Sequence, residues 1–167
     1  MKKENNKKLV GLLVALSIPF TAHAAARMVY RAGDWGVYSF KRDGKLVCYA
    51  LSAPKQSRPS DVDHGKNYFL IAPAANGGGN EPEAVLGYTV QAGSLVHVSV
   101  GEKKFKMFVK GNTAWVAEAV REPEFINALR SGSRMTLQAT SARGTRTSYD
   151  YSLSGVTAAL ERVARCK

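Results

Sequence analysis

The stretch that decides the fold is VYSFKRDGKLVCYAL, residues Val37–Leu51. Two runs of β-forming residues, Val37–Phe40 and Lys45–Leu51, flank the dipeptide Asp43-Gly44. An Asp-Gly pair accepts the positive φ angles of a tight turn, so this pattern is typical of a β-hairpin. We therefore expect two antiparallel strands here, within a sheet built from hairpins.

Further short segments of β-forming residues follow the hairpin, separated by glycine, proline and asparagine. We expect strands in Asn67–Pro73, Ala84–Val90, Ser94–Val100, Lys104–Val109, Thr113–Val116, Arg134–Ser141 and Thr145–Leu153. Between the hairpin and the first of them, Ser52–Lys66 has the composition of a loop. The lead before the hairpin, Arg27–Arg31, is short and basic.

Two other segments carry apolar residues at helical spacing. Within Glu118–Ser131 they form one stripe, and Gly132 suits a left-handed position just past the helix. Within Gly155–Arg165 they share one face, and Ser154 suits the N-cap. The stripes consist of Phe125, Ile126 and Leu129, and of Val156, Ala159, Leu160 and Val163. The pattern predicts a mainly β protein, an antiparallel β-sandwich or barrel with a short helix near residue 125 and a C-terminal helix.

Residues 1–24 have the three parts of a secretory signal peptide. Four lysines lie in Met1–Lys8, an apolar run spans Leu9–Phe20, and Ala22-His23-Ala24 places small residues at the cleavage site. The apolar run is too short to cross a bilayer core of about 30 Å as a helix. We expect cleavage after Ala24, a single domain over residues 25–167, and a periplasmic or outer-membrane-associated protein.

The chain is strongly basic, with a formal net charge of +11. The four lysines and one glutamate of residues 1–24 account for three of these charges, which leaves +8 for residues 25–167. Outside the cytoplasm such a charge favours anionic envelope polymers rather than nucleic acid. The densest basic patch is the face that carries Lys104, Lys106, Phe108 and Lys110, with Lys103 beside it. Lysines there could instead protect an edge strand from pairing with another chain.

The two cysteines, Cys48 and Cys166, form an even count in an exported chain, which predicts a disulfide bond. The bond would close a loop of 119 residues and tie an early strand to the penultimate residue. A redox-active pair is disfavoured because the chain has no C-x-x-C motif, and an intermolecular bridge stays open as an alternative.

Candidate catalytic groups are sparse. His97 lies among valines, as a half-exposed strand residue would, and Asp61, Asp63 and His64 form a cluster that lacks the further ligands of a closed metal loop. Gly77-Gly78-Gly79 is not followed by the Lys-Ser or Lys-Thr of a phosphate loop. We therefore expect no catalytic residues, no cofactor and no metal, and a protein that is not an enzyme.

Several short motifs resemble the invasion-associated locus B family of Gram-negative periplasmic or surface-associated proteins. They are Gly33–Val37 (GDWGV), Cys48–Lys55 (CYALSAPK), Gly111–Trp115 (GNTAW), Ser141–Thr145 (SARGT) and Tyr151–Leu160 (YSLSGVTAAL). The resemblance implies an immunoglobulin-like β-sandwich in the cell envelope, with no known catalytic residues to carry over. It also implies an envelope role that includes host-cell association.

Three functions compete on these grounds. The first is an exported, non-enzymatic envelope protein that contributes to host-cell association or envelope integrity. The second is a cationic periplasmic binding module for an anionic envelope polymer, with peripheral contact to the outer membrane or peptidoglycan. The third is a small metal hydrolase at Asp61, Asp63 and His64. The partner expected from the first two is an envelope or host-surface component whose identity the sequence leaves open.

Overall fold

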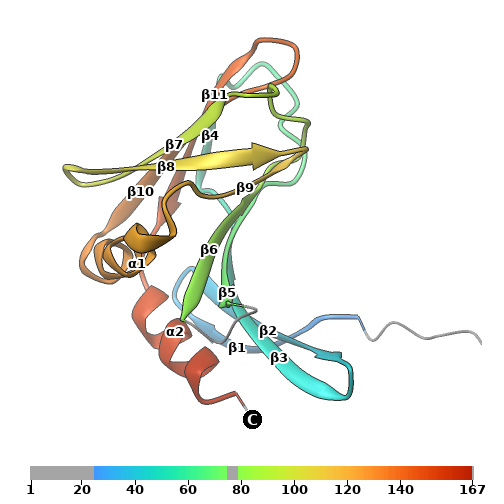
Figure 1. Cartoon of the computed structure of the whole chain (residues 1–167), viewed down its shortest axis with the longest axis vertical. Helices are drawn as coiled ribbons and strands as arrows, with labels where there is room; N and C mark the ends of the chain where they lie inside the picture. Colours follow the sequence, from blue (N-terminus) through green and yellow to red (C-terminus); the bar gives the residue numbers. More distant parts are fainter. Residues whose placement is uncertain (1–24, 75–78, 167) are drawn as a thin grey trace, which may run out of the picture.

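The computed structural model describes residues 25–74 and 79–166. Within them, eleven strands form one sheet in which all hydrogen-bonded neighbours are antiparallel (Figure 1). The strands are β1 Arg27–Ala32, β2 Trp35–Arg42, β3 Lys45–Ser52, β4 Gln56–Arg58, β5 Tyr68–Pro73, β6 Asn80–Val85, β7 Leu95–Val100, β8 Lys103–Lys110, β9 Thr113–Val116, β10 Arg134–Thr140 and β11 Arg146–Ser152. Their order across the sheet is β1-β2-β3-β5-β6-β9-β8-β7-β10-β11-β4. The helices are η1 Ala119–Arg121, α1 Glu122–Ser131 and α2 Val156–Ala164.

The predicted hairpin is confirmed. Arg42 of β2 pairs with Lys45 of β3, and the two residues between them have positive φ, 51° at Asp43 and 75° at Gly44. Such angles are strained for most side chains and ordinary for glycine and, to a lesser degree, aspartate. The Asp-Gly pair thus fixes the register of the strands that flank it.

The long sheet folds back on itself, so that its two halves face each other across the core. The ring of Phe69 in β5 lies 6.0 Å from that of Tyr151 in β11. The indole N–H of Trp35 in β2 donates to the carbonyl oxygen of Ser152 at 3.0 Å. The predicted mainly β, antiparallel class with its two helices is confirmed, and the two layers are halves of one continuous sheet.

Helix α1 fills the centre of the inner face. Its Phe125 ring stacks on Phe105 of β8, with 4.3 Å between centroids, and meets the edge of Phe69 at 5.9 Å. The predicted apolar stripe is buried as expected. Gly132 ends the helix, but its φ of −86° is not left-handed. Glycine fits there because a Cβ atom would lie 2.5 Å from a Val100 methyl group.

Helix α2 packs against β1, β2 and β3 and continues the inner layer (Figure 1). The predicted Ser154 cap is wrong: Gly155 is the N-cap, with φ 93° and no side-chain cap hydrogen bond. The turn from β11 into the helix brings Gly155 against the backbone of Ala32, where a side chain has no room. The predicted disulfide between Cys48 and Cys166 is formed, and it fastens the end of α2 to β3 with 6.1 Å between Cα atoms.

Three strands differ from the sequence prediction. The basic segment Arg27–Arg31, for which no strand is predicted, lies in β1, and β4 lies inside the expected loop Ser52–Lys66. The strand predicted to begin at Ala84 is β6, which ends at Val85. β6 includes Glu-Pro-Glu, which has low β-propensity, yet β5 and β9 supply its partners. Pro82, which has no N–H to donate, precedes the part of β6 that pairs on both sides.

No helix among the described residues is long and apolar enough to cross a membrane. The predicted signal peptide, residues 1–24, lies outside the described residues, as does most of the glycine triplet.

Candidate functional site

Strand β8 shows how the sheet divides its side chains between two faces. Phe105 and Met107 point inward and are 2% and 0% exposed. Lys104, Lys106 and Phe108 alternate with them and are exposed on the opposite, outward face. The helices cover the inward face, so the outward face is where the sheet presents side chains to solvent (Figure 1).

The structure brings three of the four predicted patch lysines together and separates the fourth. Lys104, Lys106 and Lys110 share the outward face. Lys103 lies on the other side, where its ammonium group is 3.9 Å from a carboxylate oxygen of Glu124 in α1. β8 pairs with β7 and with β9, so it is not an edge strand. The alternative that these lysines protect a sheet edge is therefore wrong.

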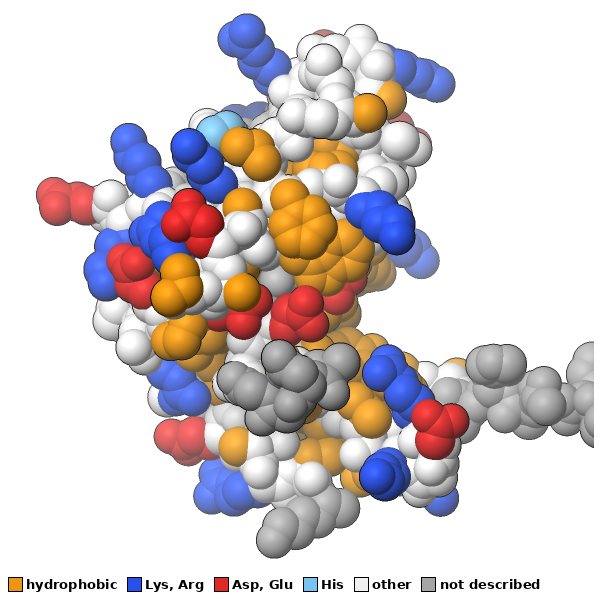
Figure 2. Space-filling model, in the orientation of Figure 1, with side chains coloured by type: hydrophobic (Ala, Val, Ile, Leu, Met, Phe, Trp, Pro, Cys, Tyr) orange, Lys and Arg blue, Asp and Glu red, His pale blue; other side chains and the backbone are white. Residues whose placement is uncertain are grey.

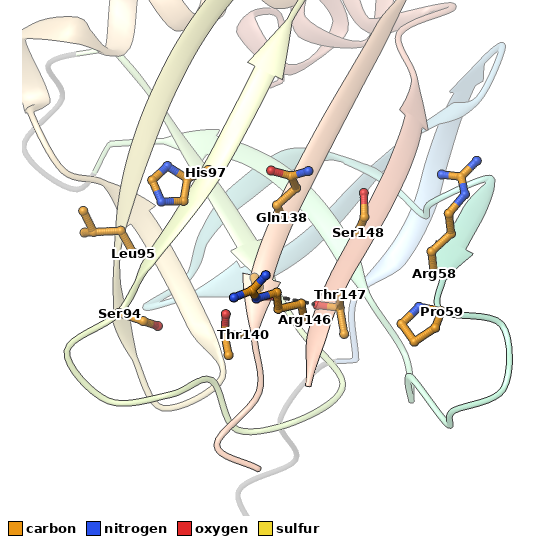
Figure 3. Close-up of a pocket in the computed structure, with 11 residues that line it drawn as sticks. Arg58, Pro59, Ser94, Leu95, His97, Gln138, Thr140, Arg146, Thr147 and Ser148 are labelled. Atoms are coloured by element: carbon orange, nitrogen blue, oxygen red, sulfur yellow. Dashed lines mark hydrogen bonds between the residues drawn. The ribbon is translucent and has the colours of Figure 1, made fainter. Parts of the chain in front are cut away.

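A hollow of about 850 Å³, lined mostly by residues with polar side chains, lies beside these lysines on the outward face of β7, β10, β11 and β4. Figure 3 shows its residues, which come from four strands and from the loops at their ends. We call it the cationic hollow; its outward-facing and loop residues are Arg58, Pro59, Ser94, Leu95, His97, Gln138, Thr140, Arg146 and Ser148.

The strand registers order the floor of the cationic hollow into one row. Lys106 of β8 pairs with His97, His97 with Gln138, Gln138 with Ser148, and Ser148 with Arg58. Paired residues in neighbouring strands lie side by side on one face. Four strand spacings of about 4.8 Å put Lys106 and Arg58 roughly 19 Å apart at the two ends of the row.

One carboxylate lies on this part of the outward face, and it is already paired. Arg58 donates to Asp150 at 2.9 Å, and the hydroxyl of Thr136 donates to its other oxygen at 2.8 Å. Burial acts to raise the pKa of Asp150, but these hydrogen bonds and the charges of Arg58 and Arg134 outweigh it, so the pKa lies below the usual value. Asp150 is therefore ionised at neutral pH and neutralises Arg58 alone.

A row of apolar side chains borders the cationic hollow. Leu95 of β7 pairs with Phe108, and Phe108 pairs with Trp115 of β9, on which its ring stacks at 5.6 Å. Next to Trp115 in the pairing lie Glu83 of β6 and then Leu70 of β5. Phe108 is 47% exposed although it is a large aromatic side chain. Leu95 and Phe108 thus place exposed apolar surface beside the hollow.

Beyond this row lies a second depression of about 400 Å³, which we call the aromatic groove. Its outward-facing strand residues are Phe40, Arg42, Val47, Tyr49, Leu70, Ala72 and Glu83. Figure 2 shows the molecule hollowed at this level, with hydrophobic side chains on both sides. Burial, and secondarily the charge of Glu81, raises the pKa of Glu83, although a hydrogen bond from Trp115 acts in the opposite direction.

His64 has a structural role. One ring nitrogen lies 2.8 Å from the hydroxyl of Tyr149 and the other 2.7 Å from the carbonyl oxygen of Pro59. Asp63 accepts the backbone N–H of Gly65 at 2.8 Å, as in a polar turn. Among the described residues, no three or more His, Cys, Asp or Glu side chains are placed to hold a metal ion. The hypothesis of a metal hydrolase at Asp61, Asp63 and His64 conflicts with this geometry.

His97 is exposed and lies between Lys106 and Gln138, not between a serine and a carboxylate. Its sequence context indicates only a strand residue, and local patterns do not single out Arg58, Gln138, Arg146 or Ser148. The alternation of β10 does place Gln138 opposite its apolar residues. No sequence signal, however, pairs β10 with β7 or β11 with β4.

These features define a class of protein: an antiparallel β protein with a helix-covered inner face and an outward face that carries lysine, arginine and exposed apolar side chains. A family model described as "Invasion associated locus B (IalB) protein" matches residues 35–164. The chain belongs to the invasion associated locus B (IalB) family, which confirms the resemblance of its motifs.

Among solved structures, the crystal structure of invasion associated protein b from Bartonella henselae is similar, with a TM-score of 0.61 and 16% identity. The similarity covers 85% of this chain and 96% of that one, and at this identity it shows a shared fold. A comparison with curated proteins finds no match.

Proposed function

We propose that the protein is an exported, non-enzymatic member of the IalB family that contributes to host-cell association or envelope integrity. Membership of the family carries this proposal. Neither the name of the family nor that of the structurally similar protein refers to a catalytic activity. The signal-like residues 1–24 and the Cys48–Cys166 disulfide support a periplasmic or outer-membrane-associated location.

A deletion in the source organism, complemented in two ways, tests this proposal. One strain receives the full gene and the other a gene without residues 1–24, so that only export differs. We expect the deletion to lower host-cell association or to raise sensitivity to detergents, and only the exported form to restore it. Unchanged phenotypes in both assays, or rescue by the form without residues 1–24, would contradict the proposal.

A second candidate function is that of a cationic binding module for an anionic envelope polymer. The observation that favours it is the shared outward face of Lys104, Lys106 and Lys110. A net charge of +8 over residues 25–167 would strengthen attraction to a polyanion. The partner would then be lipopolysaccharide or peptidoglycan, contacted from the periplasm or at the outer membrane.

Cosedimentation with purified lipopolysaccharide and with peptidoglycan tests this second function. Ion pairs across a solvated surface are screened, with a Debye length of about 10 Å at 0.1 M salt and about 3 Å at 1 M. We expect binding at low ionic strength that falls steeply between these concentrations. Binding that is absent, or that salt does not change, would contradict an electrostatic module.

A further inference from the structure

We infer that the cationic hollow binds an acidic saccharide, that is, a segment of sugar chain that carries phosphate or carboxylate groups. This inference rests on the second candidate function and names the site and the ligand chemistry for it. Three properties of the hollow carry it: its unpaired cations, its row of hydrogen-bonding side chains, and its apolar border.

The cations come first. Lys106 and Arg146 lie on or beside the hollow, and in the part of the chain that the structure describes neither forms an ion pair. The carboxylate on the outward face of these strands, Asp150, is held by Arg58 and Thr136. The hollow therefore carries an excess of positive charge that an anionic ligand would neutralise. Arginine can hold a phosphate or carboxylate through two parallel hydrogen bonds.

The hydrogen-bonding groups come second. Between the two ends of the row lie His97, Gln138 and Ser148, and Thr140 and Ser94 extend the polar surface toward Arg146 (Figure 3). An amide both donates and accepts hydrogen bonds, as do a hydroxyl and a neutral imidazole. Sugar hydroxyl groups need partners of both kinds. A small anion such as free phosphate would engage one end of a row roughly 19 Å long and leave the rest unused.

The apolar border comes third. Leu95 lines the hollow and pairs with Phe108, whose ring stacks on Trp115 at 5.6 Å. A pyranose ring has a face of C–H groups that packs on an aromatic or aliphatic surface, while its edge carries the hydroxyls. A sugar chain could therefore rest on Leu95 and Phe108 while its polar edge meets Gln138 and its anionic groups meet Lys106 or Arg146. A partner held only by charge would make no contact that requires this apolar border.

The test uses the exported chain, residues 25–167, and the delipidated, phosphorylated core oligosaccharide of lipopolysaccharide as the probe. Titration calorimetry compares it with the same oligosaccharide after phosphatase treatment and with inorganic phosphate. We expect saturable binding of the phosphorylated oligosaccharide, weaker by about tenfold or more after dephosphorylation, because the charged groups that Lys106 and Arg146 would hold are then lost. We expect inorganic phosphate to bind more weakly still.

Matched variants locate the site. Arg146→Gln and Gln138→Ala change the hollow, whereas Arg143→Gln removes an exposed charge outside it, from the connection between β10 and β11. Phe108→Ala removes the exposed ring of the border. We expect about tenfold weaker binding for Arg146→Gln, a smaller loss for Gln138→Ala and Phe108→Ala, and a change within about twofold for Arg143→Gln. Thermal melting checks that each variant is folded.

The outcomes separate the inference from the function on which it rests. If the wild-type chain binds none of the probes, no lipopolysaccharide and no peptidoglycan, the cationic-module function fails. If it binds lipopolysaccharide or peptidoglycan but not the phosphorylated oligosaccharide, only the saccharide assignment is overturned. If it binds but Arg143→Gln and Arg146→Gln weaken binding equally, the attraction is diffuse and the hollow is not the site. If inorganic phosphate binds as tightly as the oligosaccharide, or Phe108→Ala and Gln138→Ala change nothing, the ligand is an anion and the saccharide assignment is overturned.

Discussion

The inward and outward faces of one sheet have different physical tasks. The inward face carries one continuous apolar core: Phe69, Phe125 and Tyr151 meet there, and the first two are fully buried. The outward face of the same strands carries lysine, arginine and exposed aromatic rings. Because side chains alternate along a strand, one residue contributes to the core and the next one faces the solvent. Substitutions should therefore divide sharply into those that change stability and those that change binding.

Loss of the disulfide should produce the largest effect, because this bond clamps α2 to the inward face. Cys48 and Cys166 are 118 positions apart, and the chain-entropy model gives about 5 kcal/mol for such a loop. We expect the double variant Cys48→Ser/Cys166→Ser to lose about that much stability in urea unfolding. The wild-type chain should show no free thiol without reductant. Two titratable thiols in native protein would contradict the bond.

Phe69→Ala should reduce the stability of the fold almost as much as loss of the disulfide does. Its ring is fully buried and meets Trp35, Phe125 and Tyr151, so truncation leaves a cavity at the centre of the inward face. We expect a loss of about 4 kcal/mol in the free energy of unfolding. The matched control is Phe108→Ala on the outward face, with an expected loss of about 1 kcal/mol from its stacking on Trp115. Equal losses would remove the distinction between the faces.

Asp150→Asn should reduce stability by about 1 kcal/mol at neutral pH, since Arg58 is largely solvent-exposed and its attraction is screened. The folded-state pKa of Asp150 is lowered, so its contribution is complete above the unfolded value of about 3.9 and is lost as the pH falls through the folded value. The stabilities of wild type and Asp150→Asn should therefore become equal in acid. A stability difference that grows below pH 4 would contradict this assignment.

Glu83→Gln should change stability least, and it should raise the stability rather than lower it. The folded-state pKa of Glu83 is raised, chiefly by burial, so ionisation disfavours the folded state once the pH exceeds the unfolded value of about 4.3. We expect the variant to melt slightly higher than wild type at pH 7 and equally at pH 3.5. A lower melting temperature at pH 7 would show that the carboxylate is stabilising.

Much of the inward face could be predicted from the sequence. The Asp43-Gly44 turn and the apolar stripe of α1 both follow from local patterns, and the structure confirms them. β1 was missed because nearly all its residues are exposed, which leaves no apolar alternation to detect. The predicted position of β6 is wrong because the pairing of this strand depends on β5 and β9 rather than on its own composition.

The candidate site was predictable only in part. The alternation within β8 places Lys104, Lys106 and Phe108 on one face, as expected. The cationic hollow, by contrast, depends on pairings between distant segments, such as His97 with Gln138 and Ser148 with Arg58. The sequence likewise does not show that Lys103 pairs with Glu124, since Glu124 belongs to a helix that packs on the other face. Residue type alone carries no signal for such pairings.

The most direct test of the division between faces compares two adjacent residues of β8. Lys106→Gln changes the outward face, and Met107→Ala truncates a fully buried side chain. Affinity for the phosphorylated oligosaccharide and melting temperature are measured on the same samples. Lys106→Gln should weaken binding several-fold with little change in melting temperature. Met107→Ala should lower the melting temperature by about 5 °C or more and keep its affinity while folded. The reverse pattern, or equal effects of both substitutions on both quantities, would contradict the account.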